Sequence, residues 1–363
     1  MALFTVGLLM GSWGPMIPVY AQRTGETKAS IGILLGVASG TGFVMVLLGG
    51  YLVARIEIRR VMQLGTSVIA VGLVGLALLD TKPLLVIAAA LAGAGVALTN
   101  LSGNQATSRS GHPSAMTHNS IANTVYAFGA VSAPLLIALG VPGPALLIAA
   151  AVIAVTGGVL LNQLAWKVPH ERQTTGRRDS STMFLVWMFL IGIAGYVALE
   201  ASIAGWLPTA VIDSGGSATL GAWASTIFYV AMAFGRLLLS FSGTRLRPSK
   251  IVVIAMLLVV VVLLASGPFK PYFGITLVGF LMAPIFSSAA VWLARLTPGD
   301  PSATTWMLLA AQAGGTVFPP LVGYALQDTS VPFTLLLTPI AATSLVAYSI
   351  VAVVRRRQIA AHR

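Results

Sequence analysis

Cysteine is absent from this 363-residue chain, and charged residues make up only 8% of it. The lack of cysteine excludes disulfides, a thiol nucleophile and thiolate metal sites. Soluble domains carry roughly 25% charged residues, so the low charge content excludes an ordinary water-soluble protein. The hydrophobic fraction is 57%, in runs long enough to cross a bilayer. The sequence therefore predicts an all-α polytopic membrane protein embedded in a lipid bilayer.

Several kinds of functional site are also missing. The four histidines lie in or beside connections without paired metal-ligand spacing, so we predict no metal and no cofactor. No Gly-x-x-x-x-Gly-Lys-Ser/Thr loop is present, which argues against ATP-driven transport within this chain. The net charge of +12 comes from short basic clusters between apolar runs. Membrane topology explains such clusters, and we therefore predict no nucleic-acid partner.

Twelve apolar runs predict twelve transmembrane helices, which fill the chain because each span with its connection takes about 25–30 residues. The predicted helices cover residues 3–20, 30–53, 61–79, 83–104, 118–140, 144–164, 183–211, 218–241, 251–267, 271–294, 303–326 and 331–354. No room remains for a soluble domain. Any chemistry must therefore take place between the helices.

One long polar segment, residues 165–182, divides the chain into two six-helix bundles, 1–164 and 183–363 with a short basic tail. We predict that this segment is a cytoplasmic linker. At an offset of 186, GAVSAPLL at 129–136 matches GTVFPPLV at 315–322, and the same offset aligns Gly49 and Arg59 with Gly235 and Arg245. This agreement indicates two six-helix pseudo-repeats, as in many transporters. A chance match of common membrane residues is the alternative.

The distribution of Lys and Arg predicts the orientation. In the twelve-helix arrangement only Arg23, Lys28, Lys82 and Lys270 fall on one side, and the other 17 of the 21 basic residues fall on the opposite side. Cytoplasmic connections carry an excess of Lys and Arg. We therefore expect both termini in the cytoplasm, in a protein of the inner membrane.

Glu200 is an acid well inside the seventh apolar run. A carboxylate at the centre of a membrane helix costs roughly 2.5–3.5 kcal/mol, so it must face a protein interior or a watery cavity. Tyr196 lies four residues earlier on the same helical face, and Trp206 follows within about two turns. We interpret Glu200 as a proton-coupling group on a substrate path. A structural acid bonded to a neighbouring helix is the alternative.

The connection after the second predicted helix reads GGYLVARIEIRR, with basic residues behind a Gly-rich helix end. It resembles the loop signature of the major facilitator superfamily, in which an Asp-Arg pair joins helices two and three. Ala54 replaces the Asp, so a relay through that acid does not transfer. The resemblance implies a gating loop built from Gly50, Arg55, Glu57 and Arg59, with Arg236 and Arg245 in the second half. Simple positive-inside anchoring is the alternative for some of these residues.

The resemblance extends over nearly the whole chain. Residues 12–42 are similar to the first two helices of the fucose-permease-like and rhizopine-transport-protein-like branch, where helix seven often carries Glu followed six residues later by Trp, as Glu200 and Trp206 do. The resemblance implies a mid-membrane cavity that opens to either side as the two halves rock. Related sugar symporters use acids in helices one and four. This chain has only Asn100 and Asn104 in helix four, which moves any proton coupling to Glu200.

Polar and aromatic residues on the predicted cavity-facing helices are the candidate substrate contacts. One polar stripe on helix five includes Asn123 and Tyr126, and glycines and prolines around Trp13 are expected to interrupt helix one. Interhelical hydrogen bonding is the competing role for any of them. The predicted substrate-binding residues are Trp13, Asn100, Asn123, Tyr126, Tyr196, Trp206, Tyr229 and Gln312.

These features together predict a secondary active transporter of a small organic solute, sugar-like or of mixed polarity, that works by alternating access with proton coupling. A proton-driven multidrug or metabolite exporter is the alternative. A passive channel remains open, and a membrane enzyme is disfavoured because no nucleophile–base pair or metal set accompanies Glu200. We expect a monomer whose partners are its substrate, protons and the bilayer.

Overall fold

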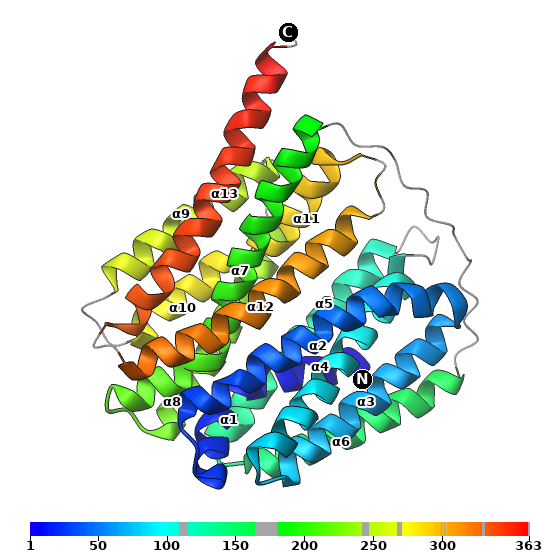
Figure 1. The fold of residues 1–363 in the computed structure, drawn as a ribbon, viewed down its shortest axis with the longest axis vertical. Helices are drawn as coiled ribbons and strands as arrows, with labels where there is room; N and C mark the ends of the chain where they lie inside the picture. Colours follow the sequence, from blue (N-terminus) through cyan, green and yellow to red (C-terminus); the bar gives the residue numbers. More distant parts are fainter. Residues whose placement is uncertain are drawn as a thin grey trace.

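The computed structural model describes residues 1–108, 115–163, 180–241, 247–266, 271–298, 300, 302–328 and 331–361. These residues are helical almost throughout and contain no strand. The first half holds α1 (Ala2–Thr24), α2 (Lys28–Arg55), α3 (Ile58–Leu78), α4 (Lys82–Ser108), α5 (Ala115–Ala138), α6 (Gly143–Leu160) and the 3-10 helix η1 (Leu161–Gln163). The second half holds α7 (Ser180–Asp213), α8 (Ala218–Phe241), α9 (Pro248–Ala265), α10 (Pro271–Met282), α11 (Ile285–Leu296), α12 (Ala303–Asp328) and α13 (Phe333–Ala361) (Figure 1).

The all-helical prediction with twelve spans is confirmed, with one correction. Ten segments of the described chain are long and apolar enough to cross a membrane, and α5 and α12 complete the twelve. The helix predicted over 271–294 is two helices, because α10 ends at Met282 and α11 begins at Ile285. Pro284 lies between them; it has no N–H to donate, and its ring clashes with the carbonyl four residues earlier. The two helices together make one span.

The predicted interruption of the first helix is wrong. Helix α1 is continuous from Ala2 to Thr24 although Pro15 and Pro18 lie inside it. Close packing holds it in place: a Cβ at Gly7 would lie 2.1 Å from the Tyr126 carbonyl oxygen, and one at Gly11 would lie 2.2 Å from that of Ala130. Such close backbone approach to α5 stabilises a membrane helix despite a lost hydrogen bond.

The two halves pack in the same way. Helix α1 packs on α5 as α7 packs on α12, α2 packs on α4 as α8 packs on α10, and α3 packs on α6 as α9 packs on α13. Gly49 of α2 faces Leu101 of α4, and Gly235 of α8 faces Ala283 next to α10. These two glycines are the pair that the sequence offset aligned, so their equivalent packing supports a duplicated six-helix unit.

Three glycines with positive φ follow helices at one end of the bundle. Gly25, Gly140 and Gly215 follow α1, α5 and α7, with φ of 70°, 94° and 88°. After α5 and α7 the next amides donate back to the helix, from Val141 N to Leu136 O and from Gly216 N to Val211 O, each over 2.9 Å. This left-handed cap satisfies the last helical carbonyls and starts a tight hairpin to the next span.

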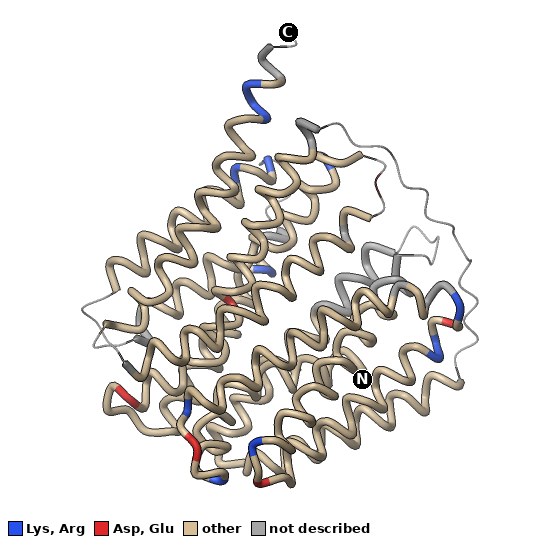
Figure 2. Tube along the Cα trace, viewed as in Figure 1, with Lys and Arg blue, Asp and Glu red and all other residues tan. Residues whose placement is uncertain are grey.

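The charged residues lie mainly at the two ends of the bundle (Figure 2). We call the end where α2 meets α3 and where α13 finishes the basic end; its described basic residues are Arg55, Arg59, Arg60, Arg247, Lys250, Arg295, Arg355, Arg356 and Arg357. We call the end with the α1–α2 and α7–α8 turns the opposite end. Its described basic residues, Arg23, Lys28 and Lys82, each form an ion pair.

The two halves contact each other along α2–α12, α1–α7 and α5–α8. Packing is tight toward the opposite end, where a Cβ at Gly14 of α1 would lie 2.3 Å from the carbonyl oxygen of Ala204 in α7. A Cβ at Gly36 of α2 would lie 2.7 Å from Pro320 of α12. Toward the basic end α3 and α6 diverge from α7 and α13 (Figure 1). The structure therefore closes the opposite end and spreads the basic end.

Candidate functional site

Glu200 lies beside a cation that the sequence had placed elsewhere. The Arg236 Nη2 atom is 3.9 Å from Glu200 Oε1, and the two side chains are 33% and 23% exposed, respectively. Glu200 is in α7 and Arg236 is in α8, inside the segments long and apolar enough to span a membrane. Opposite charges at this distance offset part of the free energy of placing each of them in the membrane. The acid and the cation therefore form one site.

The position of Arg236 corrects the prediction that it belongs to a gating loop. It lies within α8, more than a turn before the helix ends at Phe241. Tyr229, Met232 and Arg236 share one helical face because they are three, four and seven residues apart. The Tyr229 hydroxyl donates to the carbonyl oxygen of Met10 in α1 over 3.2 Å. Arg236 therefore faces the first half of the chain, toward the interface between the halves.

Three predicted substrate-binding tyrosines lie near this ion pair. Tyr196 of α7, Tyr229 of α8 and Tyr126 of α5 each interact electrostatically with both Glu200 and Arg236. Tyr196 and Tyr229 are 0% and 8% exposed, and Tyr126 is half-buried. Tyr126 comes from the first half and the other two from the second. The structure thus brings together Glu200, Arg236 and three tyrosines from both halves.

The two predicted tryptophans are sealed from solvent. Trp206, predicted to contact substrate, is 1% exposed, and its Nε1 donates to the Pro319 carbonyl oxygen over 2.6 Å. Its ring lies between two glycines: a Cβ at Gly32 of α2 or at Gly323 of α12 would be 2.2 or 2.1 Å from its Cζ2 atom. Trp206 therefore ties α7 to both helices near the opposite end. Trp13 is 5% exposed, within the core.

Two predicted polar contacts are half-buried on other helices. Gln312 of α12 lies at the interface between the halves, where a Cβ at Gly42 of α2 would be 2.1 Å from its Nε2 atom. Asn100 lies on α4. Gln312 is on the helix that contacts both α2 and α7, so it borders the same interface as the ion pair.

The loop between α2 and α3 forms a local charge cluster. Glu57 lies 3.4 Å from Arg59 and 3.6 Å from Arg60, measured between the nearest oxygen and nitrogen atoms. The Arg55 guanidinium lies 4.1 Å above the centre of the Tyr51 ring. Glu57 is thus paired with basic residues of the first turn of α3. Exposed pairs of this kind contribute only about 0–1 kcal/mol, so they orient the loop more than they stabilise it.

Three predicted site residues are not described by the structure, or only their backbone is. Arg245 falls in 242–246, outside the described residues. Asn123 lies on α5 and Gly50 on α2, and the description covers their backbone only. The linker predicted over 165–182 falls mostly in 164–179, also outside the described residues.

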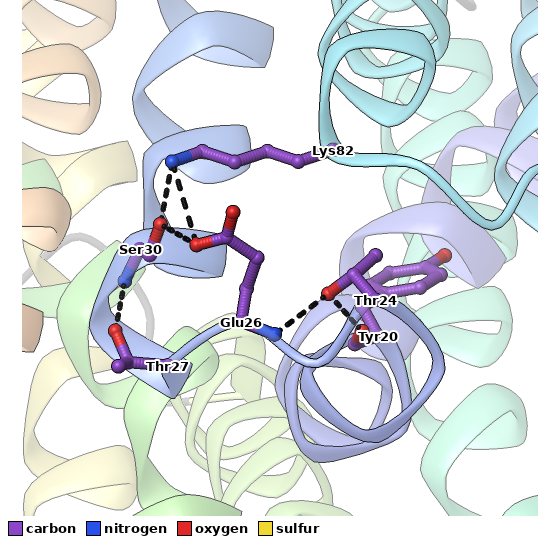
Figure 3. Close-up of polar contacts among 6 residues, drawn as sticks. All are labelled: Tyr20, Thr24, Glu26, Thr27, Ser30 and Lys82. Carbon is purple, nitrogen blue, oxygen red and sulfur yellow. Dashed lines mark hydrogen bonds and ion pairs between the residues drawn. The ribbon is translucent and has the colours of Figure 1, made fainter.

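Sequence reasoning missed the ion pairs at the opposite end. Lys28 at the start of α2 pairs with Asp213 at the end of α7, which links the two halves. Lys82 reaches the Ser30 hydroxyl and the Glu26 carboxylate, and the Ser30 hydroxyl donates to Glu26 over 2.8 Å (Figure 3). The available signal was that this side has as many acids as basic residues. Which acid meets which cation depends on the tertiary structure.

This arrangement suits reversible binding of a small molecule and a proton. A carboxylate, a guanidinium and phenol hydroxyls offer hydrogen-bond donors and acceptors between two halves that contact each other through only a few helices. Among the described residues no group of three or more His, Asp or Glu side chains is placed to hold a metal ion.

Comparisons with known proteins agree on one family. The model of the Major Facilitator Superfamily matches residues 1–213, more than half of the chain. An uncharacterized MFS-type transporter of Yersinia pestis is 32% identical over 105 residues, which are 29% of this chain and 27% of that relative. The matched segment therefore spans about a quarter of that relative.

Two solved structures are similar over almost their full length. A mutant of the nucleoside transporter NupG has a TM-score of 0.73 and 14% identity, with 97% of this chain and 98% of that chain covered. FucP, a Major Facilitator Superfamily transporter in an outward conformation, has a TM-score of 0.67 and 16% identity, with 96% and 97% covered. Identities this low establish the fold alone.

Proposed function

The chain belongs to the Major Facilitator Superfamily, and from this premise we propose that it is a proton-coupled secondary transporter of a small organic solute. The solute is sugar-like or of mixed polarity and crosses by alternating access. This family transports solutes and is not a family of enzymes, in agreement with the sequence prediction. The observation that carries the proposal is the Glu200–Arg236 pair, with tyrosines from both halves near it.

Glu200 is the proposed proton site. It is the one acid placed deep in a span among the described residues, and its side chain is partly open to solvent. A carboxylate next to a cation stays charged, because the cation stabilises the charged form. When the cation binds another group instead, the protonated form of the carboxyl group becomes more favourable. Rocking of the two halves changes that balance, because Tyr126 belongs to one half and Glu200 to the other. Protonation is thereby linked to conformation.

Substrate binding is proposed at the same interface. Tyr126, which is half-buried, offers a hydroxyl and an aromatic face, and the half-buried Gln312 adds an amide at the α2–α12 contact. Such groups suit hydroxylated or mixed-polarity solutes. NupG, which has the same fold, transports nucleosides, and this likeness is compatible with a polar organic substrate here.

The proposed membrane placement follows from charge. The basic end faces the cytoplasm, which puts both termini there, in an inner membrane. The protein acts as a monomer because each half supplies part of the site and the two halves complete it. The basic end, where α3 and α6 diverge from α7 and α13 (Figure 1), is then the cytoplasmic end of the proposed path.

The test is proton-driven uptake in proteoliposomes with Glu200→Gln. A thermal-stabilisation screen of purified protein against sugars, polyols and amphipathic cations first selects the solute. We expect wild-type uptake to rise with an inward proton gradient, and Glu200→Gln to bind the solute yet transport it without response to the gradient. Asp80→Asn, which removes a surface acid paired with Arg23 within one half, serves as the matched control. An unchanged gradient response in Glu200→Gln contradicts the proton role.

Export is the second candidate function, because the open basic end would load a substrate from the cytoplasm. The direction of transport separates the two functions. Uptake into right-side-out vesicles supports import, whereas proton-driven uptake into inverted vesicles supports export.

A further inference from the structure

Arg236 has more hydrogen-bonding capacity than its described neighbours use. A guanidinium carries five N–H donors. One of them reaches the Met232 sulfur at 3.2 Å, and a thioether is a weak acceptor. The Glu200 carboxylate is at 3.9 Å, which is an ion-pair distance and too long for a hydrogen bond. The Tyr196 hydroxyl also interacts with the guanidinium. Among the described residues, no carboxylate or other strong acceptor forms a hydrogen bond with the Arg236 guanidinium.

A guanidinium in this condition favours an oxyanion ligand. Its planar fork matches a carboxylate with two parallel hydrogen bonds, which are shorter and stronger than bonds between neutral groups. Arg236 is 33% exposed, so part of its side chain is accessible to a ligand. Its helical face points toward α1, as the Tyr229–Met10 hydrogen bond shows. The ligand would therefore lie between the halves and not in the lipid.

We propose that the transported solute is a small organic anion whose carboxylate is bound by Arg236 in competition with Glu200. This inference rests on the proposed transport function and names its substrate class. Tyr126, the half-buried tyrosine of the three, then contacts the hydroxylated or aromatic body of the solute. Because Glu200 is too far from Arg236 to form a direct hydrogen bond, an incoming carboxylate gains two strong bonds without first breaking one.

Charge balance links this anion to one proton. The empty site holds Glu200 and Arg236, whose charges cancel. The other titratable groups that face it are Tyr126 of α5, Tyr196 of α7 and Tyr229 of α8, with Tyr348 of α13 against Tyr196. Adding a carboxylate leaves one uncompensated negative charge in the membrane unless Glu200 takes up a proton. One anion and one proton then cross together with no net charge.

Matched pairs of solutes test the substrate class. The pairs are gluconate and glucitol, lactate and 1,2-propanediol, and benzoate and benzyl alcohol. Within each pair, the first compound has a carboxylate where the second has a hydroxymethyl group. We expect at least one carboxylate to raise the melting temperature of the full-length purified protein, and its neutral partner to have little effect. The inference fails if no carboxylate stabilises the protein, or if the two members of each pair stabilise it equally.

Variants then test the residue. Arg236→Gln is expected to weaken the carboxylate's affinity roughly 10- to 100-fold, the usual loss for a charged hydrogen-bonded partner. Arg236→Lys keeps the positive charge but cannot form the two parallel hydrogen bonds of a guanidinium. Its affinity for the carboxylate should therefore lie between those of the wild type and Arg236→Gln. Glu200→Gln removes the competitor and should tighten binding of the anion. Arg356→Gln, at an exposed arginine of α13, is the matched control and should change nothing.

A folding defect is separated from a binding defect by the double variant Glu200→Gln/Arg236→Gln, which removes both charges and leaves none unpaired. It should fold and bind the neutral member of a pair no worse than the carboxylate. Retained carboxylate preference in this variant overturns the inference. Saturable uptake of neutral solutes without a preference for carboxylates would also overturn the inference of an anionic substrate, but the proposed transport function would stand. Absence of any solute uptake would overturn the transport function itself.

Discussion

A charged side chain inside a membrane span costs roughly 2.5–3.5 kcal/mol at the helix centre, and this chain places two of opposite sign side by side. Glu200 and Arg236 come from successive helices and are 3.9 Å apart. Each of them makes the other less costly. Packing alone needs no charge at this place, which is why we assign the pair a role in the proposed transport.

Trp206 is held closely between glycines of two other helices. A Cβ at Gly32 would lie 2.2 Å from its Cζ2 atom, so Gly32→Ala must push the indole away from the Pro319 carbonyl oxygen. We expect this overpacking to lower the free energy of unfolding by about 1–3 kcal/mol. Thermal unfolding in detergent measures it.

The control for this prediction is Gly103→Ala, because the nearest atoms to a Cβ at Gly103 lie 3.9 Å away, in ordinary contact. Its stability should stay within about 0.5 kcal/mol of wild type. Trp206→Phe removes the ring atoms that the new methyl strikes, so Gly32→Ala should cost less in that background. Equal costs in both backgrounds would show that Trp206 is not the obstacle.

At the scale of helices, the ends of α2 and α7 are tied by Lys28 and Asp213. This pair joins the halves, whereas Arg23 and Asp80 pair within the first half. Exposed pairs contribute about 0–1 kcal/mol, so Asp213→Asn should shift the population that is open at the opposite end by up to about fivefold. A pair this weak can break and reform as the halves move.

The cysteine-free sequence makes this shift measurable. A cysteine at Leu35, which is 7% exposed and packs on α7 near Gly205, reports opening through its rate of labelling by an impermeant maleimide. In this background Asp213→Asn should label faster and Asp80→Asn should not. If both variants speed labelling equally, the effect is one of surface charge and not of a link between halves.

At the scale of the whole molecule, the predicted topology assigns the net charge of +12 to the basic end, where nine of its basic residues are described. The opposite end, with Lys270 and Asp328 assigned to it by sequence, has as many acids as bases, and Glu200 and Arg236 cancel within the membrane. The count of 17 basic residues for one side therefore becomes 16, since Arg236 lies in α8. The asymmetry remains large enough to set the orientation.

Single cysteines test that orientation. Ala218, at the start of α8, is exposed at the opposite end, and Ile56, after α2, is exposed at the basic end. We expect a cysteine at 218 to react with an impermeant maleimide in intact cells, and one at 56 to react only in inverted vesicles or after permeabilisation. The reverse pattern would place the basic end outside.

The sequence by itself determined the helical class, the twelve spans and the duplicated halves, because hydrocarbon forces each spanning segment to satisfy its own backbone. It also singled out Glu200 and the tyrosines near it as candidates, since an acid in an apolar run is visible without coordinates. It mistook Pro15 and Pro18 for helix breaks and missed the break at Pro284. Whether a proline breaks a helix depends on the neighbouring helices that hold it.

Only the tertiary structure decided which groups meet. Arg236 is 36 positions from Glu200 in the sequence, and its pairing with that acid depends on the packing of α7 against α8. Trp206 looked like a cavity residue by spacing, yet the two glycines that enclose it come from α2 and α12. Periodicity reports which face of a helix a residue occupies, but its partner is set by distances between helices that the order of residues does not encode.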